Sequence, residues 1–304
     1  MLTEGPTEGL EGARDRARTG RVRVEPILGA DLPEVGAFLH AHLNPRLSPR
    51  QWAAAAAPTW PGEAPNHGFL LRAGDGVEAE VVGVQLAFYA QRRIAGATES
   101  VCNLAAWCVR EEHRSHGLRL LRAVLAQRGY AFTDLSPSGS VVALNERLGF
   151  AHLDTTTALV ANVPGTGRGR VVTDLDEIEA RLDAEQRTIL RDHRGAAAAR
   201  HLLMLAGGEQ CYVIYRRDRR RGLRLFATLL HVDDPAVLAR HQGVLRRHLL
   251  SRGLPVTLAE LRVVGDRPAV SVPLSRPRPK MVRGTGVPPS AIDSLYSELA
   301  LVAW

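Results

Sequence analysis

One stretch, in which an apolar strand passes through a polar segment into an amphipathic helix, constrains this chain most. Apolar residues fill positions 104–109, and from Leu118 onward apolar side chains recur at helical spacing. Between them, Arg114 and Gly117 lie three residues apart. At such a junction, the free N–H groups of the first helical turn and the positive end of the helix dipole favour a pyrophosphate. The sequence therefore predicts a phosphate-binding loop over Arg114–Arg119.

The two common glycine-rich phosphate motifs, Walker and Rossmann, do not occur here. The segment resembles instead the signature of the Gcn5-related N-acetyltransferases, in which a strand ending in Val is followed by Arg-x-x-Gly-x-Gly/Ala opening a helix. Val109 precedes Arg114 by five, as in that family, although Arg119 stands where a small residue is usual. A second segment, from Ser140 to the Leu-Gly-Phe that ends at Phe150, resembles the family's fourth helix. The resemblance covers roughly residues 21–160.

Composition sets broad limits. The 304 residues suffice for two ordinary domains, and the content of 45% hydrophobic and 23% charged residues is that of a soluble globular protein. The formal net charge of +7 is carried by arginine except for one lysine, Lys280, which together with the many alanines indicates a high-GC bacterial genome. This charge is either a solvated surface or an attraction for an anionic ligand such as coenzyme A. Three cysteines in apolar runs, Cys102, Cys108 and Cys211, indicate buried thiols in a reducing cytoplasm.

The expected organisation is a disordered tail over residues 1–20, a first domain over 21–163, a linker over 164–171 and a second domain over 172–304. In the first domain we expect strands at 21–27, 69–73, 80–94, 99–109, 130–135 and 151–161, and helices at 31–43, 48–57, 118–127 and 140–148. The tail has no apolar core of a secretory signal, and no apolar run reaches membrane-spanning length. We therefore expect a cytoplasmic protein with no membrane partner.

The second half echoes the first. Leu230-His-Val232, a loop and a helix ending before Gly253 parallel Trp107-Cys-Val109, a loop and a helix ending before Gly129. The offset is 123 residues at the valine and 124 at the glycine. Either this is a second, eroded copy of one fold or two amphipathic units look alike by chance. A copy whose loop begins with Asp233 and Asp234 would repel a pyrophosphate, so we expect it to carry no cofactor.

The fold class expected from the resemblance is α/β, with two tandem units, each a mixed, mostly antiparallel sheet flanked by helices, like the acyl-CoA N-acyltransferases. The resemblance also implies a cofactor, acetyl-CoA or another acyl-CoA, lying along the strand that ends at Val109. The residues expected to contact it are Trp107, Val109, Arg114, Ser115, His116, Gly117, Leu118, Arg119 and Asn145.

Acyl transfer to an amine requires a base for the amine and an acid for the leaving thiolate. The family's usual glutamate position is Asn103 here, and its usual tyrosine position is Asn145, so neither residue supplies the chemistry. Glu99, on the same strand face as position 103, is the candidate base, although it can equally be an exposed strand-end carboxylate. Tyr130 is the candidate acid, with a half-buried structural tyrosine as the alternative; Tyr296 is a further tyrosine worth testing.

Other chemistries find less support. Cys108, His113 and His116 lack a fourth ligand at zinc-like spacing, so no metal site is expected. The basic run 216–224 is either a solvated hairpin tip or a docking site for an acidic carrier protein or nucleic acid.

The sequence therefore predicts an acyltransferase that moves an acyl group from acyl-CoA to an amine of a small-molecule or peptide acceptor. One alternative is a catalytically inactive module that binds a thioester or a partner, which the loss of both usual acid–base residues favours. Another is an aminoacyl-tRNA-dependent transferase, but the intact Arg-x-x-Gly loop favours coenzyme A over RNA, and nucleic acid is not expected as a partner.

Overall fold

The computed structural model describes residues 21–94, 96–164, 167–220, 222–284 and 287–303, so the predicted tail lies outside the described residues. These residues form two compact units. The first contains residues 21–54, 65–87 and 106–128. The second contains residues 55–64 and 88–105 and the described residues from 129 onward.

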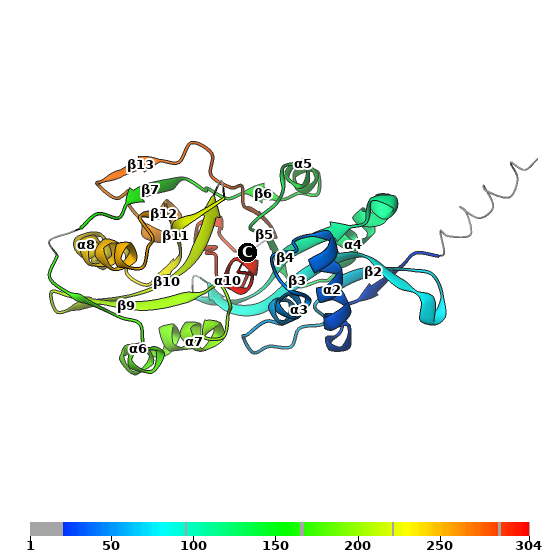
Figure 1. Cartoon of the computed structure of the whole chain (residues 1–304), viewed down its shortest axis with the longest axis horizontal. Helices are drawn as coiled ribbons and strands as arrows, with labels where there is room; N and C mark the ends of the chain where they lie inside the picture. The colour runs from blue at the N-terminus through cyan, green and yellow to red at the C-terminus, as the bar shows by residue number, and fades with distance from the viewer. Residues whose placement is uncertain (1–20, 95, 165–166, 221, 285–286, 304) are drawn as a thin grey trace, which may run out of the picture. The chain divides into compact units, whose positions relative to one another are not determined.

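The first sheet is mixed and mostly antiparallel (Figure 1). Along the sheet its strands are β1 (Arg23–Pro26), β2 (Gly68–Ala73), β3 (Glu80–Ile94), β4 (Ala97–Val109), β5 (Ala131–Asp134), β14 (Met281–Arg283) and β6 (Ala151–His152). β5 runs parallel to β4, whereas β14 runs antiparallel to both β5 and β6. A crossover is required between parallel neighbours, and the helix between β4 and β5 supplies it.

The helical segments of the first half agree closely with the sequence pattern. They are η1 (Gly29–Asp31), α2 (Leu32–His42), α3 (Pro49–Ala56), η2 (Gly76–Glu78), η3 (Glu111–His116), α4 (Gly117–Leu125) and α5 (Gly139–Arg147). One difference concerns the polar segment before α4, which was expected as a loop and is the 3₁₀-helix η3. Short 3₁₀ turns commonly lead into α-helices, so the polar composition does not distinguish the two.

The second sheet has the same mixed character. Its order is β13 (Ser271–Pro273), β7 (Thr157–Ala161), β12 (Val256–Glu260), β11 (Leu223–Val232), β10 (Glu209–Arg220), β9 (Arg200–Ala206) and β8 (Arg170–Val172). β11 and β12 are parallel, and the other strand pairings described in this sheet are antiparallel. The accompanying helices are α6 (Leu175–Arg181), α7 (Ala184–His193), α8 (Pro235–Ser251), α9 (Leu261–Val264), η4 (Pro289–Ala291) and α10 (Glu298–Leu301).

The predicted internal repeat is confirmed. In the first copy the order is β3, β4, α4 and β5, and in the second it is β10, β11, α8 and β12. In both copies the strand after the helix pairs in parallel with the strand before it. The expected fold class, two tandem mixed sheets flanked by helices, is what the structure has.

The region 151–161, expected as one strand, consists of two short strands that belong to different sheets. β6 pairs with β14 in the first sheet, whereas β7 pairs with β12 and β13 in the second. The intervening Asp154 accepts hydrogen bonds from both the backbone N–H and the hydroxyl of Thr156, a local turn that interrupts the run. The second sheet is thus completed by a strand that precedes the glycine-rich segment 164–171.

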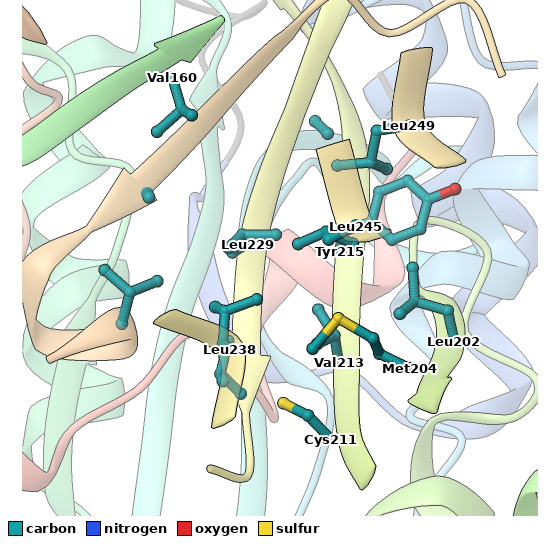
Figure 2. Packing of buried hydrophobic residues seen from close by; sticks show 14 of the residues in the cluster. Val160, Leu202, Met204, Cys211, Val213, Tyr215, Leu229, Leu238, Leu245 and Leu249 are labelled. Carbon is teal, nitrogen blue, oxygen red and sulfur yellow. The ribbon is translucent and has the colours of Figure 1, made fainter. Parts of the chain in front are cut away.

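A buried apolar cluster forms where α8 packs against the second sheet. Leu238, Leu245 and Leu249 of α8 point onto the strands that carry Val213 and Leu229 (Figure 2). Val160 of β7 belongs to the same buried cluster. This packing buries the apolar face of α8, so the second copy has a core of its own.

Candidate functional site

The N-terminus of α4 has no capping side chain. His116 occupies the cap position without a side-chain hydrogen bond, and the N–H of Gly117 donates to the carbonyl of Arg114. The first N–H groups of a helix have no partner within the helix itself. The Gly117 N–H is thus taken by Arg114, and no capping side chain takes the other N–H groups of the first turn. Anion binding at this helix start remains a prediction.

Gly117 is buried against Trp107 and Val109, which lie near the end of β4. A Cβ on Gly117 would lie 3.4 Å from Cζ2 of Trp107 and 3.5 Å from Cγ2 of Val109. Both side chains also pack against the cluster of Leu71, Val82 and Leu120. The indole Nε1 of Trp107 is buried without a hydrogen-bond partner in the part of the chain that the structure describes. The start of α4 is therefore held against the end of β4, with one unsatisfied donor beside it.

Two arginines supply positive charge here. Arg114 is 72% exposed and lies 3.4 Å from Glu111. Arg119 donates to the carbonyl of Val22 at 3.0 Å and lies 3.3 Å from Nδ1 of His116. Burial lowers the pKa of His116, and the charges of Arg119 and His113 add to the effect. His116 is thus neutral near pH 7, and the cationic side chains are the arginines. Ser115 is exposed and Leu118 half-buried.

Strands β4 and β5 part from each other at a defined point. Their parallel ladder joins Val101–Leu104 to Ala131–Asp134, after which β5 ends while β4 continues to Val109. Ala106 has φ of 50°, in the left-handed region that non-glycine residues seldom adopt. Such a residue within a strand marks an irregularity that redirects the strand. From Ala106 to Val109, β4 thus continues beyond the end of its ladder with β5.

A cluster of buried polar side chains surrounds the end of this ladder in the second unit. Asn103 donates to the hydroxyl of Thr133 at 3.1 Å and accepts from the backbone N–H of Glu298 at 3.3 Å. Ser136 donates to Oε1 of Glu298 at 2.6 Å. Asp134, the last residue of β5, accepts from the amide of Asn145 at 2.9 Å. Two carboxylates are therefore buried at the point where the strands separate.

Both carboxyl groups have raised pKa values. Burial raises the pKa of Asp134 to about 6, against the opposing hydrogen bonds from Asn145 and the Ser136 N–H. Burial raises the pKa of Glu298 to about 7, and the nearby charge of Asp134 acts in the same direction. Groups with pKa values near neutrality are suited to accept and release protons at pH 7. The arrangement can therefore supply a base.

Sequence reasoning missed both carboxylates. Asp134 ends a short apolar strand, which was a usable signal, but Glu298 is 164 residues further along the chain (298 minus 134) and no pattern connects it with β5. Asn145, expected to contact the cofactor, instead binds Asp134, and its Oδ1 has no partner among the described residues. The expected contact of Asn145 with the cofactor remains a prediction.

The two predicted catalytic residues lie elsewhere on the same strands. Glu99 is half-buried near the start of β4, five residues before the end of the ladder at Leu104, or about 16 Å along an extended strand. Tyr130 precedes β5, with its ring 5.1 Å from that of Tyr89. Burial raises the pKa of Tyr130, with a contribution from Cys102, so its hydroxyl stays protonated. The roles of both residues remain predictions.

The corresponding helix start in the second copy is already capped. Oδ1 of Asp234 accepts from the Val237 N–H at 2.9 Å, and Oδ1 of Asp233 accepts from the Tyr212 N–H at 2.8 Å. An apolar cavity of about 300 Å³ lies beside this helix, lined by residues such as Leu229, Leu238 and Ala259. A carboxylate thus occupies the position that an anion would take in α8.

The basic run 216–224 is not a uniformly solvated hairpin tip. Arg216 and Asp218 are 1% and 6% exposed, whereas Arg217 is exposed. The inward residues alternate along β10, as the two-residue period of a strand requires. Arg216 donates to the carbonyls of Leu299 and Val302. Only part of the run is therefore available to an acidic partner protein.

Among the described residues, no helix combines the length and apolar character that crossing a membrane requires.

No protein-family model and no curated protein matches the sequence of this chain. Solved structures do match its fold. A Gcn5-related N-acetyltransferase from Anabaena variabilis is 11% identical, with a TM-score of 0.55 over 86% of this chain and 72% of that one. One from Kribbella flavida is 14% identical, with a TM-score of 0.54 over 88% and 72%. A proposed acetyltransferase from Pyrococcus horikoshii is 13% identical, with a TM-score of 0.52 over 90% and 93%.

These likenesses define the class of fold as that of the acyl-CoA N-acyltransferases. More particularly, the chain has the fold of the Gcn5-related N-acetyltransferases with two mixed sheets in tandem, in agreement with the resemblance of its motifs. Because the identities are low, these likenesses show the fold alone.

Proposed function

We propose that this protein is an N-acyltransferase that uses an acyl-CoA, acetyl-CoA in the simplest case, and an amine of a small molecule or peptide. The observation that carries the proposal lies within the first unit, where the start of α4 has no capping side chain and is held against Trp107 and Val109 at the end of β4. A helix start of this kind favours an anion, and the strand beside it can accompany an extended ligand. Coenzyme A is an extended ligand with a pyrophosphate.

The residues fit that cofactor. The N–H groups that open α4, with Arg114 and Arg119, would hold the pyrophosphate, and the unpartnered Nε1 of Trp107 would be a further donor beside them. The bound cofactor supplies an acyl thioester, whose carbonyl carbon forms the new bond to the amine nitrogen as the carbon–sulfur bond breaks.

The protein's own part is to move protons. The attacking amine must lose one proton, and Asp134 or Glu298 can accept it because burial keeps their pKa values near 6 and 7. Glu99 is the competing base from the sequence. Tyr130, whose phenol stays protonated, would donate to the departing thiolate.

Calorimetry with acetyl-, malonyl- and long-chain CoA, together with thiol release in the presence of amines, tests the proposal. We expect binding of at least one acyl-CoA and amine-dependent release of free CoA. Failure of every acyl-CoA to bind would overturn the proposal. Binding without turnover for any amine would favour the inactive thioester-binding module, which the absence of a tyrosine at position 145 also favours.

A further inference from the structure

A small cationic cavity lies in the second unit, among β10, β11, β12 and the segment before β14. Its volume is about 40 Å³, enough for a group of a few heavy atoms. Four cationic side chains line it, those of Arg216, Arg220, Arg278 and Lys280, against the two carboxylates of Asp218 and Glu260. Its described lining thus has a surplus of positive charge.

The carboxylates of this cavity are already engaged. Lys280 and Arg262 lie 2.5 Å and 2.9 Å from the two oxygens of Glu260. Asp218 accepts from the Arg219 N–H at 2.8 Å and from the hydroxyl of Thr228 at 3.2 Å, and lies 3.9 Å from Arg278. Both carboxylates are therefore already paired or hydrogen-bonded and cannot fully neutralise the remaining arginines.

Arg216 and Arg220 are the cations left over. Arg216 is 1% exposed; its two terminal nitrogens donate to backbone carbonyls, which carry no net charge. Within the described part of the chain, the Nε atoms of both arginines are buried without a partner. Burial lowers the pKa of each guanidinium, and the charge of Arg278 adds to the effect, against the opposing charge of Asp218. A buried donor left without an acceptor is costly, so this cavity is built for an anion.

Two residues that line the cavity are sequence neighbours of the buried carboxylates Asp134 and Glu298. Leu135, which lines it, lies between Asp134 and Ser136, and Leu299, which also lines it, directly follows Glu298. An anionic group seated against the arginines would therefore bring the rest of its molecule beside the groups that can take a proton from an amine.

We propose that this cavity binds the carboxylate of the acyl acceptor, so that the acceptor is an amino acid or another amine that bears a carboxylate. The inference rests on the proposed function for the role of the amine, but the carboxylate site itself does not. A guanidinium pairs well with a carboxylate because its planar donors match the two oxygens.

The first test measures binding without catalysis. Thermal unfolding is followed with increasing sodium acetate, with acetamide as the neutral analogue of the same shape and sodium chloride to match ionic strength. We expect acetate, but not acetamide, to raise the melting temperature. Arg220→Gln should weaken the apparent acetate affinity at least five-fold. Arg224→Gln, an exposed arginine on the adjoining strand, is the matched control and should leave it unchanged. Equal protection by acetamide or chloride, or an unaltered acetate affinity in Arg220→Gln, would overturn the proposal.

The second test compares acceptors. We expect kcat/KM for an amino acid to exceed that for its carboxamide at least ten-fold, and Arg220→Gln to remove most of this difference while Arg224→Gln keeps it. Equal use of acid and carboxamide by the wild type would exclude the acceptor assignment. If no amine is acylated at all, the proposed function fails, and the acetate titration still decides whether the cavity binds carboxylates.

Discussion

The side-chain amide of Asn145 donates to Oδ2 of Asp134 at 2.9 Å, and both residues are buried. This bond ties helix α5 to the last residue of β5, at the point where β5 leaves β4. It stabilises the ionised form of Asp134, whereas burial favours the neutral form, and the result is a pKa of about 6. The group is thus held in place and able to titrate close to neutrality.

Replacing Gly117 tests the anion site. Gly117→Asp should weaken coenzyme A binding ten-fold or more, about 1.4 kcal/mol, because it adds bulk and negative charge at the start of α4. Gly117→Ala is the matched control, since its Cβ would lie 3.4 Å from Trp107, an ordinary contact, and should bind nearly normally. Calorimetry measures both. An unchanged affinity in a folded Gly117→Asp protein would exclude this loop as the pyrophosphate site.

The second copy should bind no coenzyme A. Asp234 already fills the N-terminus of α8, so calorimetry should give one coenzyme A per chain, and a value of two would refute the prediction. Asp234→Ala should leave the stoichiometry unchanged but lower the free energy of unfolding by about 1 kcal/mol, because it removes a helix cap. Chemical denaturation measures that loss.

The base can be identified by three substitutions compared side by side. If Asp134 or Glu298 takes the proton, Asp134→Asn or Glu298→Gln should lower kcat with little effect on KM and remove the acidic limb of the pH–rate profile near pH 6 to 7. Glu99→Gln should then behave like the wild type. If instead only Glu99→Gln removes that limb, Glu99 is the base, as the sequence predicted.

Ionisation of Glu298 should make the folded protein less stable above pH 7 than below pH 4.5. Its pKa is raised from 4.5 to about 7, so the favourable neutral form is fully present below pH 4.5, and stability is lost as the pH rises through 7. The loss is on the order of 3 kcal/mol. Glu298→Gln should therefore be more stable than the wild type at pH 8 in urea unfolding. Equal stability of the two proteins at pH 8 would contradict this.

Two buried histidines should have the opposite effect on stability, lowering it as the pH falls. Burial lowers the pKa values of His193 and His201 from 6.5 to about 4, so both are neutral in the folded state. The unfolded chain binds more protons between pH 6.5 and 4, and stability should fall as the pH is lowered through that range. His201→Gln should flatten the acid side of a stability profile from urea unfolding. A profile as steep as that of the wild type would exclude His201 as a contributor.

Local pattern was sufficient for most of the fold. The helix start at Gly117, the strand that ends at Val109 and the repeat that ends at Val232 all follow from spacing between near neighbours in sequence. Such signals predict elements because helices and strands have short periods. The same signals place the proposed anion site, because its residues all belong to one strand–helix junction.

The buried charges could not be predicted in this way. Glu298 meets Ser136 across 162 positions, and Arg216 meets the carbonyl of Leu299 across 83. Glutamate and arginine side chains usually lie at the solvated surface, and only the tertiary fold buries these two. The run 216–224 does lie at the hairpin between β10 and β11, but the burial of Arg216 and Asp218 could not be predicted, because inward and outward residues of this run look alike in sequence.

Strand β14 lies between β5 and β6, with Met281 opposite both Asp134 and His152. During synthesis, β5 and β6 therefore emerge well before the strand that must separate them. Until about 130 residues beyond β6 have been made, these two strands keep open edges that can pair with each other or with another chain. Contacts of such long range also form slowly. A nascent or truncated chain that ends before β14 should thus depend on chaperones and tend to aggregate, although the finished protein has no such exposed edge at this point of its described sheet.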